Sequence, residues 1–587
     1  MQMSKAFRLD RSMQQFFCQL LNELPPNSTS MLSRTTKLFQ TTILDLVYLL
    51  FERQRNEHDS STIQLHFSHL PASFYDLVTI IDMLRAFHDR NKKISFPETF
   101  LLRSLTREEI EHSHRYFDTT ADLQLMDFLN NHPLMTESPA ALIESLPIDA
   151  QSNSDYYRAY PSLGHIPSHC IHTRFKLLLE FSLFLEQLVS VIDFSLNPGE
   201  SIITDHVRSG RTYVLHKTKY QLFSTTLAMT ENPASEMPTV SFDIVRASIR
   251  DDQGLNTMFN QAFEQLYDRA HLIFRQHNDH LWRAQYLGMH STDQGGPYRD
   301  SITCLSSDIC STRLPLFILC PNGRTDSGSN RDRWIPNVFP PNKSIPNRTK
   351  KQYRFVGQLL GMAIRQKSYL DLKFPFLLWK QLVRDRLTYD DIEAIDTQSF
   401  TMINEVERMM EQPDEDLLSS IFDELRFEVV SSSGEIFEMI PGGHSIPVTM
   451  MNFSEYSEHY RQYRLHEFDR QIECIRQGLY SVVPGFFLSL FTAHQLEEAV
   501  CGKGEIDVPL LKRHTIYGDG YSANSPYIQR FWTVLGQIFS EEQKKLFLKF
   551  VWGRSTLPRQ DEDFTSSMTI NTFDTSDRSV DKVLPSR

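Results

Sequence analysis

Seven cysteines give this chain its most obvious capacity for covalent chemistry. They stand at positions 18, 170, 304, 310, 320, 474 and 501, and none of them forms a Cys-x-x-Cys pair with another. Such scatter is typical of reduced thiols in the cytosol or the nucleus rather than of a disulfide framework. We therefore predict a cytoplasmic or nuclear protein without structural disulfides.

Other motifs with chemical potential are incomplete. No Gly-x-x-x-x-Gly-Lys-Ser/Thr phosphate loop occurs, and His466-Glu467 is not followed by the second histidine of a metalloprotease motif. The stretch Asp326–Asn330 has oxygen donors like those of a calcium loop, but Arg331 stands where such a loop needs glycine. Without a Cys/His cluster of zinc spacing we predict no metal site, no RING-type zinc module and no cofactor.

Composition excludes further classes of function. The formal net charge of -13 argues against a general nucleic-acid binder, which would present a basic face. The apolar run Thr42–Phe51 is too short to cross a bilayer, and Lys176–Leu196 carries charged side chains. We therefore expect no nucleic-acid partner and no membrane partner. The 587 residues, 40% of them hydrophobic, are enough for roughly three or four globular domains.

The elements that must position any site change character along the chain. Residues 1–240 are predicted to be mainly helical, and one amphipathic stripe comprises Phe39, Ile43, Leu46, Val47 and Leu50. No catalytic constellation occurs there. From about Phe242 the pattern predicts mixed α and β structure. Strands are expected at 282–289, 426–430, 446–450 and around Met568 and Ile570. Helices are expected at 259–270, from Pro526, and from Ser540, which with Gln543 forms a capping pair. The Pro- and Asn-rich segment 320–351 predicts a long surface excursion.

Four separated stretches share their order and their residues with one known family. They are Asp293-Gln294-Gly295-Gly296-Pro297-Tyr298-Arg299-Asp300, Phe355 to Ala363, Pro441-Gly442-Gly443 with Val448-Thr449 and Asn452, and Phe550 to Ser555 with Leu557-Pro558. Together they resemble the HECT domain of ubiquitin ligases. The preceding His165-Ile166-Pro167 and Thr173-Arg174-Phe175 are similar to the region before this domain in very large HERC-like members.

The resemblance implies a fold and a division into domains. The fold class expected is α+β: a bilobal HECT domain with a mainly helical larger lobe and an incomplete α/β smaller lobe, preceded by a mainly helical N-terminal region. The boundaries expected are 1–240 for that region, 241–488 for the larger lobe, 489–492 for a hinge and 493–587 for the smaller lobe.

The resemblance also implies a reaction and its partners. A ubiquitin-conjugating enzyme docks on the larger lobe and passes ubiquitin to a cysteine of the smaller lobe, from which a protein substrate's lysine takes it. The docking subdomain corresponds to 397–440. Its candidate binding residues are Phe400, Ile403, Val406, Phe422 and Phe437. The alternative for each is that it simply forms the core of that subdomain.

The nucleophile implied by the resemblance falls outside the printed sequence. Leu584-Pro585-Ser586-Arg587 resembles the start of the family's L-P-x-S/A-H-T-C-F motif, which would put the cysteine near position 590. Cys501, beside Val500, is expected to be a small buried apolar residue instead. One interpretation is an active ligase recorded without its cysteine. Another is an inactive remnant that binds conjugating enzyme or substrate, and a third is an adaptor whose function lies in residues 1–240.

Overall fold

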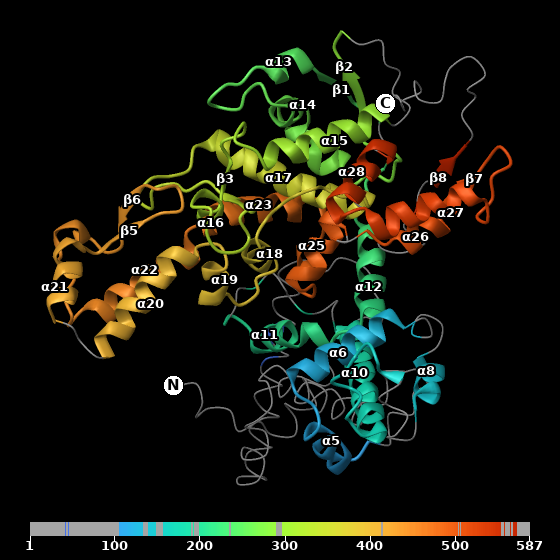
Figure 1. The fold of residues 1–587 in the computed structure, drawn as a ribbon, viewed down its shortest axis with the longest axis horizontal. Coiled ribbons are helices and arrows are strands. Elements are labelled where there is room, and N and C mark those ends of the chain that lie inside the picture. Colours follow the sequence, from blue (N-terminus) through green and yellow to red (C-terminus); the bar gives the residue numbers. More distant parts are fainter. Residues whose placement is uncertain are drawn as a thin grey trace. The chain divides into compact units, whose positions relative to one another are not determined.

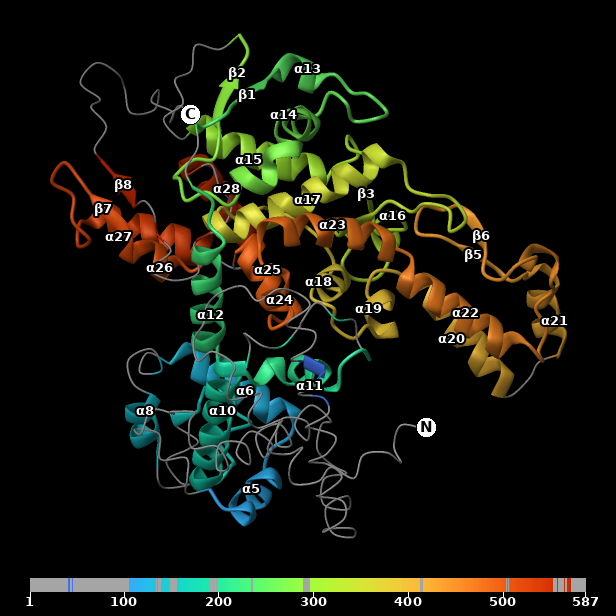
Figure 2. The same cartoon turned by 180° about the vertical axis from the view of Figure 1, so that it is seen from behind.

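The structure is a computed structural model of the chain, drawn from opposite sides in Figure 1 and Figure 2. It describes residues 41–42, 45, 105–132, 135, 139–147, 156–188, 192, 196, 199–233, 236–288, 296–411, 415–502, 504, 506–552, 557, 564 and 567–571. The predicted helical stripe from Phe39 to Leu50, the motif residues Asp293–Gly295 and the C-terminal Leu584–Arg587 lie outside this part.

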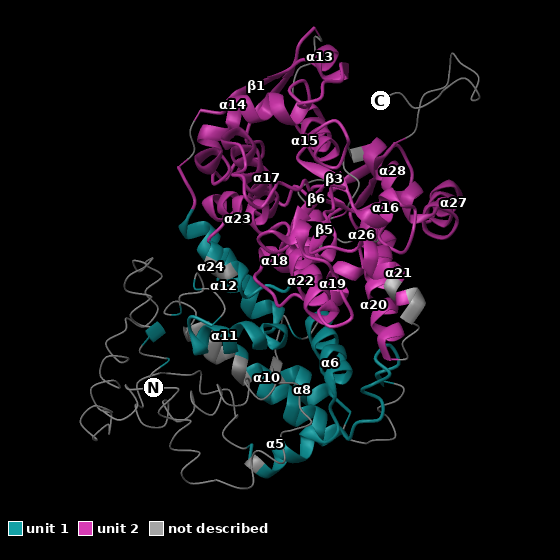
Figure 3. Ribbon diagram, turned by 90° about the vertical axis from the view of Figure 1, so that its left-hand side faces the viewer, with its two compact units in different colours: residues 1–230, 485–492 teal, residues 231–484, 493–587 magenta. Residues whose placement is uncertain are grey.

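The chain divides into two compact units, coloured separately in Figure 3. Unit 1 comprises 1–230 with 485–492, and unit 2 comprises 231–484 with 493–587. The domain boundaries derived from the sequence remain predictions, but the first division falls within ten residues of position 240.

Unit 1 is helical in its described part, as predicted. Its elements are α5 (Arg107–His114), α6 (Thr119–Asn131), α8 (Pro139–Ser145), α10 (Ser168–Leu188), α11 (Ile202–Ser209), η3 (Gly210–Tyr213), α12 (His216–Met229) and α24 (Gly485–Leu488). Helix starts are set by side-chain caps: Thr106 and Glu109 form a reciprocal capping box, and Asp118 accepts from the Ala121 backbone N–H. Leu125, Leu129, Ile171, Phe175 and Leu178 are fully buried, so the core lies between α6 and α10.

Unit 2, in the residues that the structure describes, combines helices with four short two-stranded sheets. Its first part contains β1 (Thr239–Phe242), α13 (Ile244–Ser248), α14 (Met258–Ile273), β2 (Arg283–Tyr286), α15 (Gly296–Ile309), β3 (Phe317–Leu319), α16 (Pro321–Arg324), β4 (Trp334–Pro336), α17 (Asn347–Gln366), α18 (Phe376–Leu382) and α19 (Tyr389–Glu393). Strands β1 and β2 pair in parallel, and β3 and β4 pair antiparallel. The α+β character expected from the sequence is confirmed.

The remainder of unit 2 begins with a helical group and a hairpin. These elements are α20 (Thr397–Glu411), α21 (Glu415–Glu424), β5 (Glu428–Val430), β6 (Ile436–Glu438), η4 (Gly443–Ser445), α22 (Phe453–His466) and α23 (Asp469–Val482). After residue 492 follow α25 (Ala493–Cys501), α26 (Val508–Arg513), β7 (Thr515–Tyr517), α27 (Pro526–Thr533), the π-helix η5 (Val534–Ile538), α28 (Glu541–Trp552) and β8 (Met568–Ile570). Strands β5 and β6 are antiparallel, whereas β7 and β8 are parallel.

The helices α17 and α23 form the central contact of unit 2 (Figure 1). Glycines allow them to approach closely, because a Cβ at Gly357 would lie 1.8 Å from the Ile475 carbonyl oxygen, and one at Gly478 would lie 1.9 Å from that of Arg354. The F-x-G-x-x-x-G-x-A stretch from Phe355 therefore serves packing. Phe355 itself is fully buried.

The last hundred residues pack in two separate environments within unit 2. Helix α25 packs against α17 and α18, and the Leu370 N–H donates to the Val500 carbonyl over 2.9 Å. The segment after it has its own core, formed by Ile506, Leu511, Ile528, Trp532, Leu535, Leu548, Leu557 and Met568. The expected capping box at the start of α28 is present, since Ser540 and Gln543 each bond the other's backbone N–H. The lobe boundary at 492/493 stays a prediction.

Two expectations from the sequence are wrong. Residues 446–450, all described, form no strand and contribute only an isolated bridge between Pro447 and Arg426. Segment 320–351 is not a surface excursion throughout, because Cys320 and Ile335 are fully buried and β4 pairs with β3. In the described part of the chain, no helix combines the length and apolar character needed to cross a membrane.

Candidate functional site

The predicted docking region is a distinct group of elements within unit 2. Helices α20, α21 and α22 and the β5–β6 hairpin lie together, on the side of α23 away from α15 in both opposite views (Figure 1, Figure 2). We call residues 397–466 the α20–α22 subdomain. Its interior contains Ile403, Val406, Leu418, Phe422, Phe427, Val429, Val448, Phe453, Tyr456 and Tyr460.

The structure brings most of the five candidate binding residues together, but inside the subdomain. Ile403, Val406 and Phe422 belong to its buried cluster, and Phe437 packs against that cluster while remaining partly exposed. Phe400 is 1% exposed and is not part of the cluster. Four of the five side chains are therefore buried, and whether the set binds a conjugating enzyme remains a prediction.

Exposed apolar side chains on the same subdomain were missed by the sequence analysis. Val430 and Ile436 are cross-strand partners in the β5–β6 hairpin, 54% and 62% exposed, and Met402 on α20 is 62% exposed. Val429 and Phe437, the adjacent pair, face the interior instead. The alternation of a strand could have revealed this, because neighbours along a strand point to opposite faces.

A buried charge network anchors the subdomain to the rest of unit 2. Arg464 on α22 pairs with Asp396, and its guanidinium donates to the Ser432 hydroxyl over 2.8 Å. Ser432 in turn donates from its N–H and its hydroxyl to Glu467, over 2.8 and 2.6 Å. Burial alone would lower the pKa of Arg464, but Glu467 and Asp396 raise it above its ordinary value. The cation stays charged, which matters because breaking a buried pair is costly.

The P-G-G…V-T-x-x-N stretch shapes the loop that follows the hairpin, between β6 and α22. Gly442 has a φ of 75°, in the left-handed region that glycine adopts without strain, and a Cβ at Gly443 would lie 2.4 Å from the Phe427 carbonyl oxygen. The Asn452 side chain accepts from the Thr449 N–H over 2.7 Å and donates to the Pro447 carbonyl over 3.1 Å. These motif residues therefore have structural roles.

Five of the six thiols in the described part of the chain are poorly placed for nucleophilic attack. Burial raises the pKa of Cys170, Cys310, Cys320, Cys474 and Cys501. For Cys310 the value reaches about 12. The Cys501 Sγ lies 3.9 Å from the Leu372 carbonyl oxygen, an acceptor that does nothing to stabilise a thiolate. Because the thiolate is the nucleophile, these cysteines lack the environment of a transfer centre.

A cavity of about 390 Å³ in unit 2 contains one of these thiols. Cys310 lines it together with Asp332, Asp371, Lys373 and Lys549. Charges of both signs surround the sulfur, and the Lys373 N–H donates to it over 3.4 Å. This mixed lining does not offset the loss of hydration, so the high pKa of Cys310 persists in the cavity.

Comparison with known proteins matches the second half of the chain to one family. Residues 303–586 match the family described as HECT-domain (ubiquitin-transferase). Over 286 residues the chain is 37% identical to E3 ubiquitin-protein ligase HERC2 from Mus musculus, a match that covers 48% of this chain and 6% of HERC2. Human HERC2 matches to the same extent.

More distant relatives match as well. The probable E3 ubiquitin-protein ligase HECTD4 from Homo sapiens is 24% identical over 428 residues, covering 68% of this chain and 10% of HECTD4. Human E3 ubiquitin-protein ligase NEDD4 is 28% identical over 280 residues, covering 47% of this chain and 20% of NEDD4. The chain thus spans only a small part of the length of these relatives.

Proposed function

Since residues 303–586 of this chain form a HECT domain, we propose that the chain is part of a ubiquitin ligase. In this proposal it receives ubiquitin from a conjugating enzyme and transfers it to lysines of a protein substrate. The observation that carries the proposal is the family match, which covers the α15–β8 region of unit 2.

The reaction consists of two exchanges at one carbonyl. A thiolate of the ligase attacks the thioester that joins ubiquitin to the conjugating enzyme, a new C–S bond forms, and the enzyme's thiolate leaves. A substrate lysine then attacks the new thioester, an amide forms, and the ligase thiolate is released. The first step exchanges one thioester for another, so accessibility and thiolate character of the nucleophile determine its rate.

We place the nucleophile near position 590, following Leu584-Pro585-Ser586-Arg587, which resembles the start of the family's cysteine motif. The raised pKa values of Cys310, Cys474 and Cys501 support this assignment, since these thiols would be protonated at neutral pH.

We further propose that the conjugating enzyme docks on the α20–α22 subdomain, within 397–440. Phe437 is the candidate residue with access to a partner, while Ile403, Val406 and Phe422 support it from the interior and Phe400 is buried outside that cluster. The exposed Val430–Ile436 pair adds a second apolar surface, on the opposite face of the hairpin from Phe437. Partly exposed aromatic anchors commonly dominate the binding energy of an interface.

A thioester assay tests the proposal. The 587-residue chain and a version continued by a family-type His-Thr-Cys-Phe segment are each mixed with ubiquitin-charged conjugating enzyme, and reductant-sensitive adducts are separated on a gel. The continued version should form the adduct, whereas the 587-residue chain and a control continued by His-Thr-Ser-Phe should not. An adduct on the 587-residue chain that survives Cys501→Ala and disappears with another cysteine would show a misplaced nucleophile. Binding of conjugating enzyme without any adduct would favour the inactive-scaffold interpretation.

A further inference from the structure

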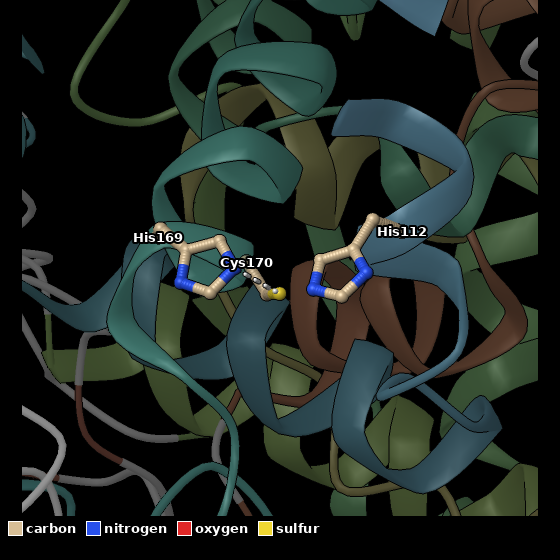
Figure 4. A group of neighbouring side chains, drawn as sticks. All are labelled: His112, His169 and Cys170. Atoms are coloured by element: carbon tan, nitrogen blue, oxygen red, sulfur yellow. Dashed lines mark hydrogen bonds between the residues drawn. The ribbon is translucent and has the colours of Figure 1, made fainter. Parts of the chain in front are cut away.

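Unit 1 brings together three side chains with metal-binding atoms. His112 is on α5, and His169 and Cys170 are in the first turn of α10; one ligand atom from each lies within 4.8 Å of the others (Figure 4). The Cys170 Sγ lies 3.3 Å from the His169 Nε2. The rings of His112 and His169 stack, with centroids 5.4 Å apart and an interplanar angle of 11°.

A buried network next to this cluster holds the two helices in place. Arg174, one turn after Cys170 on α10, donates to both carboxylate oxygens of Asp122 on α6, over 2.7 and 2.5 Å. The same guanidinium lies 2.7 Å from the Nδ1 of His114 on α5. Arg174 and Asp122 are 0% and 1% exposed. Because breaking a buried charge pair is costly, this network holds α5 against α10, which brings the His112 ring opposite that of His169.

The spacing of the three ligand atoms suits a small tetrahedral cation. Zinc bonds of ~2.0–2.1 Å to nitrogen and ~2.3 Å to sulfur place neighbouring ligand atoms about 3.4–3.6 Å apart. The sulfur and Nε2, 3.3 Å apart, are close to that separation. His112 can close the remaining distance by side-chain rotation, since its imidazole is exposed.

Accessibility distinguishes a metal site from a catalytic Cys–His pair. Cys170 is 0% exposed, so its sulfur cannot reach the carbonyl of a bulky substrate. Both imidazoles are exposed, however, so an ion can approach the cluster from solvent on the side of its two nitrogens. Imidazole and thiolate ligands favour binding of Zn²⁺ over Mg²⁺ or Ca²⁺, which take oxygen ligands.

We propose that His112, His169 and Cys170 form a zinc-binding site that joins α5 to α10. The two imidazoles each contribute a nitrogen lone pair, and Cys170 contributes its sulfur, releasing the thiol proton to solvent. Three protein ligands leave the fourth position of the tetrahedron to water or to a ligand.

Metal titration of the full chain tests this site. After removal of metal with chelator, Zn²⁺ binding is measured by calorimetry, and Co²⁺ is used as a spectroscopic probe because a cobalt–thiolate bond gives a charge-transfer band. We expect His112→Gln, His169→Gln and Cys170→Ser each to weaken Zn²⁺ binding by about tenfold or more, since even loss of an outer-shell partner costs ~10–100-fold. Cys170→Ser should also abolish the charge-transfer band.

Matched variants keep the result interpretable. His165→Gln replaces another exposed histidine of unit 1, and Cys304→Ser replaces a partly exposed cysteine of unit 2; both should bind as the parent does. Zn²⁺ should raise the melting temperature of the parent and of these controls but not that of His112→Gln. Without metal, His112→Gln and the parent should melt at the same temperature. Undiminished binding in the three ligand variants, or no binding by the parent, would overturn the proposal.

Discussion

At the scale of single residues, the surroundings of a thiol decide whether it can act as a nucleophile. Cys310 and Cys501 are partly buried next to backbone groups, and loss of hydration disfavours the thiolate of each. Hydrogen bonds from or to neighbouring backbone are too few to reverse that effect. Both thiols therefore stay protonated, although Cys501 is partly exposed and not fully buried as the sequence predicted.

Alkylation should show directly that Cys310 and Cys501 are unreactive in the folded chain. With a pKa of about 12, Cys310 would be thiolate in roughly one molecule in ten thousand at pH 8, so iodoacetamide should leave it and Cys501 unmodified. Mass spectrometry of the folded chain and of the chain in guanidinium chloride makes the comparison. The pKa of the Cys310 thiol is about 12 in the folded state and near 9 in the unfolded state. Between these pH values the unfolded state loses the proton and the folded state keeps it. The free energy of unfolding should therefore fall as the pH rises from about 9 to about 12. Rapid modification of the folded chain at pH 8 would contradict the assignment.

Substitution of two phenylalanines in the α20–α22 subdomain should distinguish an effect on binding from an effect on stability. Phe400→Ala removes a side chain that is 1% exposed and should destabilise unit 2 by about 3–5 kcal/mol. Phe437→Ala should instead weaken binding of the conjugating enzyme by about 1–3 kcal/mol with a smaller loss of stability. Calorimetric titration and thermal melting measure the two effects. Tyr527→Ala, at an aromatic residue 70% exposed elsewhere in unit 2, is the control and should change neither. Equal losses of stability in both phenylalanine variants would make Phe437 a core residue.

At the scale of elements, unit 2 depends on the close contact of α17 with α23. Three glycines, Gly357, Gly361 and Gly478, occupy positions where a Cβ would collide with the other helix. Close approach lets the two backbones and their neighbours bury large side chains such as Phe355 and Trp379. The α20–α22 subdomain is attached directly before α23, so the position of this helix also determines where α22 ends.

A single methyl group should disturb this contact. Gly357→Ala places a Cβ 1.8 Å from the Ile475 carbonyl oxygen, which belongs to the backbone and cannot rotate away. We expect destabilisation at the upper end of about 1–3 kcal/mol, measured by denaturant unfolding. Gly536→Ala is the matched control, because its Cβ would make only an ordinary contact of 3.6 Å with Val508. Equal stability of the two variants would show that the helices can separate without cost.

At the scale of the whole molecule, stability should differ along unit 2. The region around α17 and α23 contains fully buried residues such as Tyr353, Trp379 and Leu479. The segment after α25 has a smaller core, and it exposes large apolar side chains: Tyr527, Ile538, Leu546, Phe550 and Val551 are 39–70% exposed. Fewer buried contacts leave a segment open to local unfolding.

Hydrogen exchange should show this gradient. Amides of α26–α28 should exchange faster than those of α17 and α23, whereas α25 should be protected together with α17 and α18, against which it packs. Mass-spectrometric exchange of the full chain resolves these segments. Equal protection of α26–α28 and α17 would contradict the gradient, and rapid exchange of α25 would assign it to the smaller lobe.

The amino-acid sequence by itself determined the features that depend on local pattern or on motif order. Helical periodicity predicted α14 and α27, a capping pair predicted the start of α28, and the order of four motifs predicted the HECT domain that the family match confirms. These signals lie within short stretches, so no knowledge of packing is needed to read them. The binding roles of Phe400, Ile403, Val406, Phe422 and Phe437 remain predictions.

Only the tertiary structure decided which side chains are buried and which distant residues meet. Helical periodicity alone could not show whether the face bearing Ile403 binds a partner at the surface or packs in the core, because the stripe is apolar in either case. The Pro-rich segment around Ile335 is buried because β3 supplies a partner strand from outside it. The cluster of His112, His169 and Cys170 could not be predicted from the sequence for the same reason. His112 and His169 are far apart in sequence, and the pairing of α5 with α10 through Arg174 brings them together.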